Sequence, residues 1–466
     1  MKRLALPVLI FISLSLASCT SQDRWSQMTK IENEIIKTSF PADTFNIRDF
    51  GADNTDPEFL NSQAINSAME KCSAAGGGVV LIPKGVWLTG PINLKSNVNL
   101  HLAEGSTLLF STDSILYTPA VLTRWEGMDC YNTHPLIYAY EAKNIAITGK
   151  GTLNGQGSDK HWWYMCGRSE YGWKEGMISA PSAGRPRLLG YEQNQTPVEK
   201  RVFTLQDALR PQFIHFYKCN TVLVEDVTLK NSPFWVMHPL LTSNLIVRGV
   251  TVMSEGPNSD GCDPESCDHV LIDKCYFNTG DDCIAIKSGR NNDGRRWNVP
   301  SKNIIVRNCH MAAGHGGVAI GSEISGGYSN LFVEDCDMDS PELLRVIRIK
   351  TSNCRGGTIE NINVRNIKVG RCKEAVLHIS LLYEPEENCT RTYPPFVRNV
   401  SLENVTSGSS DYGVYIEGLK ESTNISDITV KNCSFNGVKY GNLVNGAERV
   451  CFKNLRINGV AVKNQE

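Results

Sequence analysis

Short stretches of alternating apolar and polar residues recur through the second half of the chain. In each copy a strand-like run is followed by a polar pair and then by one small apolar residue. The copies are NTVLVEDV, NLIVRGV, HVLIDKC, NIIVRNC, NLFVEDC, NINVRNI, NVSLENV, DITVKNC and RVCFKNL. Their final apolar positions run from Val227 to Leu455 and lie 22 to 38 residues apart. A repeated strand with connections of variable length indicates a solenoid.

The repeat predicts an all-β protein, a parallel β-helix. One such unit cannot bury its apolar face alone, whereas stacked units form a continuous core. Gly and Asn are frequent at the turns, and the Leu/Asn spacing of leucine-rich repeats, the rival architecture, is missing. Several final positions hold cysteine, which fits small buried residues better than disulfides between coils. These are Cys275, Cys309, Cys336 and Cys433.

One β-helix domain is predicted over residues 44–462. Residues 61–75 have helical spacing and end at the glycine run 76–78. We therefore expect a short N-terminal helix that caps the open end of the stack. Residues 155–212 interrupt the period and are rich in Trp, Gly, Arg and Pro. They are predicted to form a long loop insertion over one face, covering the cleft.

The N-terminus has the pattern of an export signal. Lys2 and Arg3 precede an apolar run that is too short to span a membrane, and LASC follows it. Residues 1–18 are expected to be a lipoprotein signal peptide, with Cys19 lipidated and residues 19–43 serving as a tether. An ordinary secretory signal is the alternative. We expect an exported bacterial lipoprotein, periplasmic or at the cell surface, tethered to a membrane.

Charge and cysteine content narrow the function classes. The 466 residues carry 47 basic and 49 acidic side chains, a formal net charge of −2, without a run of Lys or Arg. This balance argues against a nucleic-acid partner, and an acidic polymer would have to be bound by local basic residues. Among the 16 cysteines, Cys262 and Cys267 are close enough in sequence for a local disulfide.

Four consecutive coils carry unusual polar residues, in GPNSDGCDP, NTGDDCIAIKSG, AGHGGVAIGSE and RVIRIKTS. In the second, a turn after Gly280 would let both Asp281 and Asp282 project outward before a strand begins at Cys283. Stacking would gather the polar side chains of all four stretches on one outer face. The collected residues are Asp260, Asp281, Asp282, His315, Arg348 and Lys350.

This combination of side chains suits hydrolysis of a glycosidic bond. One protonated carboxyl group donates a proton to the leaving oxygen, while an ionised carboxylate activates the attacking water. Crowding of three carboxylates raises the pKa of at least one of them, which keeps an acid protonated near neutral pH.

The motifs NSD, GDD, GHG and RIK, in this order and spacing, resemble those of the polygalacturonases of glycoside hydrolase family 28. The segment FNIRDFGA…GGGVVLIPKGVWLTGPINLKSNVNLHL is also similar to those enzymes, so the resemblance covers nearly the whole mature chain. It implies a right-handed parallel β-helix that hydrolyses the α-1,4-galacturonosyl linkages of pectin with inversion. It implies neither a metal ion nor another cofactor.

The resemblance also implies a role for each catalytic position. Asp281 would be the general acid, and Asp260 and Asp282 would hold and deprotonate the attacking water. His315 would tune the acid and keep the polar patch hydrogen-bonded. The family inverts although its carboxylates lie close together, so the usual relation between carboxylate separation and stereochemistry does not apply to it.

Substrate contacts follow from the same motifs. Arg348 and Lys350 would bind the carboxylate of a galacturonate ring through charge-assisted hydrogen bonds. Tyr383, in SLLYEPE, corresponds loosely to a substrate-contacting tyrosine. Ser259 departs from the Thr or Asn that is more usual in the first motif, but the carboxylate beside it is kept.

Other residues fit substrate contact and structural roles equally well. Lys287 and Arg290 could bind uronate charges at flanking positions, and Glu323 could contact a sugar hydroxyl, or all three could form ion pairs. Three tryptophans of the insertion could stack on a sugar or pack the loop against the solenoid. They are Trp162, Trp163 and Trp173.

The segments IAIKSGRNNDGRRWNVPS and GHGGVAIGSEISGG are more similar to the exo-acting branch of the family than to the fungal endo enzymes. An insertion that closes one end of the cleft would make the enzyme release mono- or disaccharides from a chain end. Rhamnogalacturonan and xylogalacturonan backbones are alternative substrates. A calcium-dependent pectate lyase and a non-catalytic glycan-binding β-helix fit less well, because neither requires His315 and the RIK pair beside three aspartates.

Overall fold

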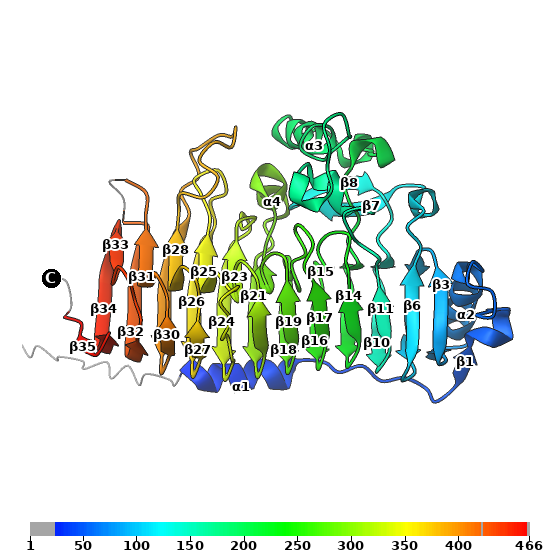
Figure 1. The fold of residues 1–466 in the computed structure, drawn as a ribbon, viewed down its shortest axis with the longest axis horizontal. Coiled ribbons are helices and arrows are strands. Elements are labelled where there is room, and N and C mark those ends of the chain that lie inside the picture. The colour runs from blue at the N-terminus through cyan, green and yellow to red at the C-terminus, as the bar shows by residue number, and fades with distance from the viewer. Residues whose placement is uncertain (1–23, 421–422, 464–466) are drawn as a thin grey trace, which may run out of the picture.

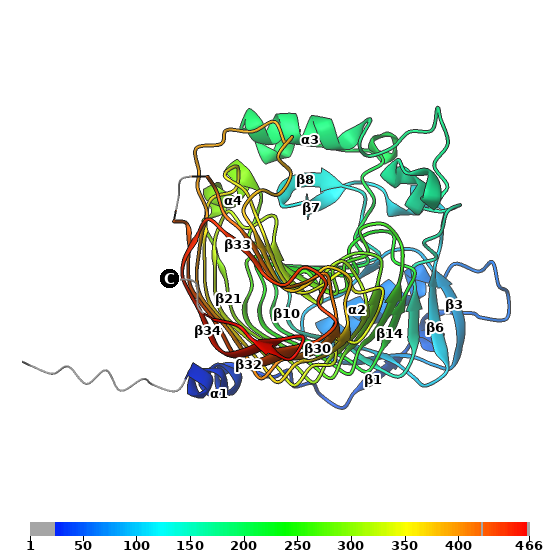
Figure 2. The ribbon, with the colours of Figure 1, turned by 60° about the vertical axis from the view of Figure 1, so that its left-hand side comes forward.

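The computed structural model describes residues 24–420 and 423–463, so the expected signal peptide 1–18 and Cys19 lie outside the described residues. Its strands stack in parallel, coil upon coil, into an elongated right-handed parallel β-helix (Figures 1 and 2). This confirms the predicted fold class.

The largest face is a 16-stranded sheet that contains all nine copies of the repeat. Equivalent residues lie directly beside one another, as Val222 beside Leu245 and Leu245 beside Val270. Its strands are β1 (Thr44–Asn46), β2 (Gly78–Ile82), β5 (Val98–Leu102), β10 (Lys143–Gly149), β13 (Asn220–Glu225), β16 (Ser243–Arg248), β18 (Asp268–Asp273), β21 (Ser301–Arg307), β24 (Tyr328–Glu334), β26 (Thr358–Arg365), β27 (Lys368–Arg371), β29 (Phe396–Glu403), β30 (Thr406–Ser409), β32 (Ile425–Phe435), β34 (Ala447–Ile457) and β35 (Val460–Ala461).

Two further faces complete each coil. The second face is a seven-stranded sheet of β3 (Gly85–Thr89), β6 (Ser106–Phe110), β11 (Thr152–Asn154), β14 (Thr228–Lys230), β17 (Thr251–Ser254), β19 (Tyr276–Thr279) and β22 (His310–Ala313). The third face has a four-stranded part, β4 (Ile92–Asn93), β9 (Ile137–Tyr140), β12 (Ile214–Tyr217) and β15 (Met237–Leu240). Its six-stranded part is β20 (Ile284–Ile286), β23 (Val318–Gly321), β25 (Arg345–Lys350), β28 (Ala375–Ser380), β31 (Tyr412–Glu417) and β33 (Leu443–Asn445).

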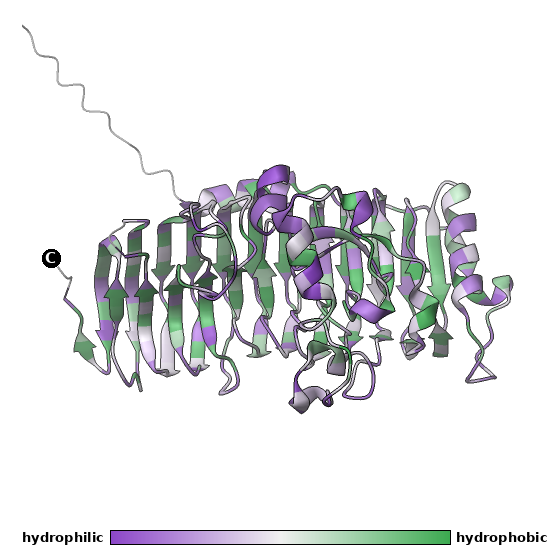
Figure 3. Ribbon diagram, turned by 90° about the horizontal axis from the view of Figure 1, so that it is seen from above, coloured by the Kyte–Doolittle hydropathy of each residue, from purple (hydrophilic) through white to green (hydrophobic). Residues whose placement is uncertain are grey.

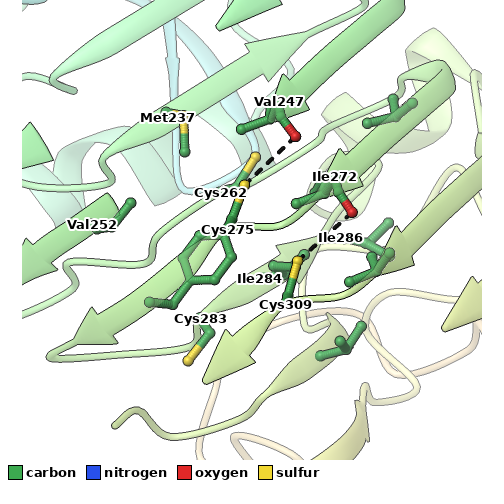
Figure 4. Close-up of a cluster of buried hydrophobic side chains, with 14 of the residues drawn as sticks. Met237, Val247, Val252, Cys262, Ile272, Cys275, Cys283, Ile284, Ile286 and Cys309 are labelled. Atoms are coloured by element: carbon green, nitrogen blue, oxygen red, sulfur yellow. Dashed lines mark hydrogen bonds between the residues drawn. The ribbon is translucent and has the colours of Figure 1, made fainter. Parts of the chain in front are cut away.

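Alternation along the strands explains the core. Hydrophobic and hydrophilic residues follow one another along the ribbons in Figure 3, because successive strand residues point to opposite faces. The repeat cysteines are buried free thiols, as expected. Cys275 Sγ lies 3.6 Å from the carbonyl oxygen of Val247, and Cys309 Sγ lies 3.7 Å from that of Ile272 (Figure 4). Both therefore behave as small core residues with a weak S–H donor.

The polar pair of the repeat forms a turn with left-handed backbone. Asn366, Asn404 and Asn454 occupy its second position with φ between 54° and 55°, a conformation that asparagine tolerates better than most residues. Asn404 Nδ2 donates to Asn366 Oδ1 at 3.2 Å, one coil away. The repeated polar position thus supplies both the turn and a hydrogen bond between coils.

The disulfide arrangement differs from the local pairing considered above. Cys262 and Cys267 are both buried and free, because both point into the core. Cys354, just after β25, is bonded instead to Cys389 in the loop that follows β28. This disulfide fixes a loop beside the third face.

Helices and loops cover the end and the top of the solenoid. Helix α2 (Ser62–Ala74) packs Ile65 and Met69 against the first coil, as predicted for the N-terminal cap (Figure 1). The 155–212 segment contains helix α3 (Gly184–Gln193) as well as loops. It stands above the third face together with α4 (Asn291–Trp297) and a hairpin of β7 (Val121–Trp125) and β8 (Met128–Asn132) (Figures 1 and 2).

Part of the expected 19–43 tether is ordered structure. Residues 24–34 form helix α1 (Arg24–Glu34), which lies on the outside of the large sheet, opposite α3 and α4 (Figure 1). Met28 and Ile31 pack on Leu271 and Phe332. The sequence interpretation missed this helix because its apolar residues are few and its mean hydropathy is low, whereas the sheet supplies the matching apolar patch.

Breaking this contact is expected to detach α1 and leave the β-helix folded. In Ile31→Asp a charge replaces a side chain that is only 4% exposed, and burial of an unpaired carboxylate is prohibitive. Limited proteolysis with trypsin should then cleave within residues 24–43 while the remaining chain stays resistant. Lys30→Ala, a change on the exposed side of the same helix, should leave cleavage at the wild-type rate; equal protection of Ile31→Asp would contradict the packing argument.

Candidate active site

The three aspartates lie where the second face turns into the third. Asp260 follows β17, and Asp281 and Asp282 lie between β19 and β20. Gly280 at this turn is needed for close packing of neighbouring coils, because a Cβ there would collide with the backbone oxygen of Gly256. The expectation that both adjacent aspartates project outward is half right: Asp281 reaches a cavity, whereas Asp282 is fully buried.

A cavity of about 420 Å³ opens above this corner. Asp260 and Asp281 lie on its wall together with His315 from the turn between β22 and β23. The opposite wall comes from the hairpin and the 155–212 insertion, which contributes Arg168 and Arg185 among other residues. The predicted insertion therefore does border the site, and it does so with basic side chains.

The aspartates form one compact acidic group. A carboxylate oxygen from each of Asp260, Asp281 and Asp282 lies within 4.8 Å of the others. Arg348 Nη1 donates to Asp282 Oδ1 at 3.2 Å, and Lys350 Nζ donates to Asp282 Oδ2 at 2.7 Å. Burial raises the pKa of Asp282, but the charges of Lys350 and Arg348 outweigh burial and hold it below the ordinary value. Asp282 is therefore ionised.

Asp281 and His315 form a hydrogen-bonded pair, with His315 Nδ1 2.9 Å from Asp281 Oδ1. Burial raises the pKa of Asp281, but the bond to His315 and the charges of Lys350 and Arg348 lower it below the ordinary value. The bond to Asp281 in turn raises the pKa of His315. The proton of the pair consequently resides on His315 in this structure.

The carboxyl group with a strongly raised pKa is Asp260. Burial, followed by the charges of Asp263 and Asp281, raises the pKa of Asp260 well above its ordinary value. Asp263 is fully buried, and neither of its oxygens accepts a hydrogen bond from the described residues. Burial also raises its pKa. Lys287 Nζ lies 3.9 Å from Asp260 and 3.6 Å from Asp263.

Lys287, Arg290 and Glu323 are joined in one buried ion network. Lys287 Nζ lies 3.2 Å from Glu323 Oε2, and Arg290 Nη1 lies 3.5 Å from Glu323 Oε1. Arg290 also pairs with Glu126, Glu384 and Glu387. All three predicted residues line the cavity, but each has its charge compensated by protein groups.

The aromatic residues around the cavity differ from those singled out in the insertion. Trp162 packs against Tyr117 with ring centroids 5.5 Å apart, and Trp163 donates to the carbonyl oxygen of Ser232. Trp173 donates to the carbonyl oxygen of Met177. All three therefore pack the insertion, and they do not line the cavity in the described structure.

Trp125 and Trp235 line the cavity instead. Lys287 Nζ lies 4.5 Å from the ring centroid of Trp235. Tyr383 also lines the cavity, and the Lys350 ammonium lies 5.3 Å from its ring centroid. The sequence could not single out Trp125 or Trp235, because neither belongs to the four polar motifs and only folding brings the hairpin over the third face.

The Asp281–His315 pair predicts a pH-dependent stability. The raised pKa of His315 stabilises the fold below its unfolded pKa of about 6.5, and the lowered pKa of Asp281 stabilises it above its unfolded pKa of about 3.9. The destabilisation caused by His315→Gln should therefore be largest near about pH 5 and should fade as pH rises through the folded pKa of His315.

Urea unfolding of wild type and His315→Gln across pH 4 to 9 measures this directly. His310→Gln is the matched control, since His310 lies on β22 at 3.8 Å from Asp337 in an exposed pair. A His315→Gln penalty that is constant over this range would contradict the shared-proton pair.

Comparison with known proteins identifies the family. Residues 199–453 match the family model Glycosyl hydrolases family 28. The solved structure of a hyperthermoactive exopolygalacturonase from Thermotoga maritima is 40% identical, with a TM-score of 0.90 over 94% of this chain and 96% of that one. A probable polygalacturonase of Vitis vinifera is 28% identical over 80% of this chain and 70% of its own. An exo-poly-alpha-D-galacturonosidase of Dickeya chrysanthemi is 24% identical over 90% and 74%, respectively.

The resemblance carried by NSD, GDD, GHG and RIK is thereby confirmed. The family match spans more than half of the chain and includes all four motifs, from Asp260 to Lys350. The chain is thus a glycosidase, and it belongs to glycosyl hydrolases family 28.

Proposed function

We propose that the protein hydrolyses α-1,4-galacturonosyl linkages of pectin from a chain end, with inversion and by general acid and base catalysis. The observation that carries the proposal is the walled cavity, with Asp260 and Asp281 on one side, the cation-bound Asp282 within 4.8 Å of both, and the basic insertion opposite. Family membership and the exopolygalacturonase of similar structure support it.

Asp281 is assigned the acid role. Arg348 and Lys350 contribute to its lowered pKa, and both line the cavity where a uronate carboxylate can reach them. Binding of that carboxylate would neutralise the two cations and so remove their lowering of the pKa of Asp281. The negative charge of the bound carboxylate would raise this pKa as well. The proton held by His315 would then move to Asp281, which lies 2.9 Å away, and from there to the leaving oxygen.

Asp260 and Asp282 are assigned to the attacking water. Oxygens that lie within 4.8 Å of one another can both bind one water at about 2.7–2.8 Å each. Asp282 is held ionised and supplies the base character, whereas Asp260, with its raised pKa, holds and orients the water. This division refines the sequence expectation, in which the two residues were equivalent.

The exo mode follows from how the cavity is closed. The hairpin contributes Trp125 and Glu126, and the insertion contributes Pro181 and Arg185 to the wall. Arg185 Nε bonds Glu126 Oε2 at 2.7 Å, which ties the two elements together. A polysaccharide chain would therefore end in the cavity instead of running through it.

The test is chromatography of the products from polygalacturonate, with and without a chelator. The proposal predicts galacturonate or its dimer as the early product in both conditions. A ladder of oligomers would show an endo enzyme and would refute the closure argument. Unsaturated, ultraviolet-absorbing products that disappear with chelator would show a lyase, and exclusive cleavage of rhamnogalacturonan or xylogalacturonan would move the substrate assignment to that backbone.

We also propose that the protein is an exported lipoprotein attached to a bacterial membrane through Cys19. The signal pattern of residues 1–19 supports this. Among the described residues, no helix is long and apolar enough to cross a bilayer. Helix α1 begins at Arg24 on the side opposite α3 and α4 (Figure 1), so a nearby anchor would leave the cavity facing away from the membrane. Labelling with a palmitate analogue should mark wild type and fail to mark Cys19→Ala; equal labelling of both would refute the anchor.

A further inference from the structure

Most basic side chains around the cavity are neutralised by the protein. Lys287 and Arg290 pair with buried carboxylates, and Arg348 and Lys350 pair with Asp282. Arg210 differs, because it lines the cavity and forms no ion pair with any carboxylate of the described residues. It is 2% exposed. A cation that deep without a counter-charge is costly, and a ligand with a negative charge would relieve the cost.

The neutral contacts of Arg210 leave part of its guanidinium group unused. Nη1 donates to the carbonyl oxygens of Pro233 and Pro257 at 3.0 and 2.7 Å, and Nη2 donates to Asn258 Oδ1 at 2.7 Å. Nε is buried and has no partner in the described part of the chain. Burial lowers the pKa of Arg210 to about 10, a pKa at which the side chain is still charged near neutral pH.

Arg168 is a second basic residue of the insertion that lines the cavity. Its guanidinium lies 4.9 Å from the ring centroid of Tyr171, and its nearest paired carboxylate, Glu170, lies 3.8 Å away in an exposed contact. The charge of Arg168 also contributes to the lowered pKa of Arg210, and both residues line the same cavity. Two cations that line the same cavity favour an anionic ligand there.

We propose that Arg168 and Arg210 bind the carboxylate of a second uronate, adjacent to the one bound by Arg348 and Lys350. The inference rests on the proposed function and sharpens its substrate. Arg348 and Lys350 belong to β25 of the solenoid, whereas Arg168 belongs to the insertion and Arg210, at the end of the insertion, bonds the turns at Pro233 and Pro257. Two neighbouring sugars would thus each be recognised by a pair of cations.

This arrangement defines the class of substrate. In homogalacturonan every residue carries a carboxylate, so both pairs of cations are filled. In a backbone that alternates uronate with a neutral sugar, one pair would face a hydroxyl or methyl group and stay uncompensated, which a site built for a charge rejects strongly. The protein is therefore selective for runs of unesterified galacturonate.

The test compares trigalacturonate with the two singly methyl-esterified trimers in which either sugar next to the scissile bond is neutralised. Wild type should cleave each ester with kcat/KM lowered about 10- to 100-fold, the loss expected from one charge-assisted contact. Arg168→Gln should no longer discriminate against the ester at one of the two positions, but it should still discriminate against the ester at the other. The change should appear mainly in KM. Arg187→Gln is the matched control, since Arg187 is an insertion residue that pairs with Asp207 outside the cavity.

Arg210→Lys provides the second variant, because it keeps the charge and removes the fork of donors. Arg210→Lys should lose discrimination against the ester at the same sugar position as Arg168→Gln. The change also weakens the contacts of residue 210 with residues 257 and 258. Equal loss on acid and ester substrates for both variants would show a structural role and would overturn the second carboxylate site. If wild type cleaves none of the trimers, the proposed function itself fails and this inference fails with it.

Discussion

Asp281→Asn is expected to lower kcat by about 10²- to 10⁴-fold, the range that general acid catalysis contributes. The amide is close in shape to the carboxyl group but cannot donate the proton that the leaving oxygen requires. Its own oxygen can still accept from His315, so the fold and the cavity should be preserved. The loss should therefore fall on kcat, with KM little changed.

Steady-state kinetics on trigalacturonate, with circular dichroism as the check of folding, measures this effect. Asp337→Asn is the matched control, because Asp337 is an exposed aspartate beside His310 on the second face and does not line the cavity. It should retain wild-type kcat. Asp281→Asn with kcat within a few-fold of wild type would remove Asp281 from the acid role and direct attention to Asp260, the carboxyl group with the strongly raised pKa.

Arg290→Met is expected to destabilise the protein by about 3–5 kcal/mol, the cost of leaving buried carboxylates without their partner. Arg290 is 1% exposed and pairs with four glutamates, which come from the hairpin, β23's end and the loop after β28. Its loss should loosen three walls of the cavity together. Activity should fall as well, because Glu323, which lines the cavity, would lose one of the four cations that lower its pKa.

Urea unfolding gives the free energy of unfolding for this comparison. Arg371→Met is the control, since Arg371 is 62% exposed and lies 3.7 Å from Asp339. Exposed pairs of this kind contribute at most about 1 kcal/mol. Arg290→Met and Arg371→Met with equal unfolding free energies would show that the network under the cavity contributes nothing to stability.

The β-helix could be predicted from the sequence because its signal is repeated. Each strand is short and weak, but the same frame recurs nine times, and parallel stacking turns that recurrence into one sheet. The capping helix was predictable for a local reason, a helical pattern ended by glycines. Helix α1 was not predictable from the sequence, because its stability comes from packing on Leu271 and Phe332, which lie on distant strands.

The candidate site divides in the same way. Asp260, Asp281, Asp282, His315, Arg348 and Lys350 could be grouped because they occupy fixed places in successive coils. The charge states of these residues could not be predicted from the sequence, because they depend on burial and on atomic distances. The contribution of Trp125 and Arg210 to the cavity could not be predicted from the sequence either. Neither residue follows the repeat, and only the folded hairpin and insertion bring them to the cavity.

The most direct test of the account is a crystal structure of Asp281→Asn with pentagalacturonate bound. The account predicts that one end of the oligosaccharide lies inside the cavity against the insertion, with the scissile oxygen beside residue 281 and one uronate carboxylate on Arg348 and Lys350. An oligosaccharide that crosses the site with sugars extending beyond the insertion would contradict chain-end cleavage. Uronate carboxylates bound away from Arg348 and Lys350 would contradict the proposed protonation of Asp281.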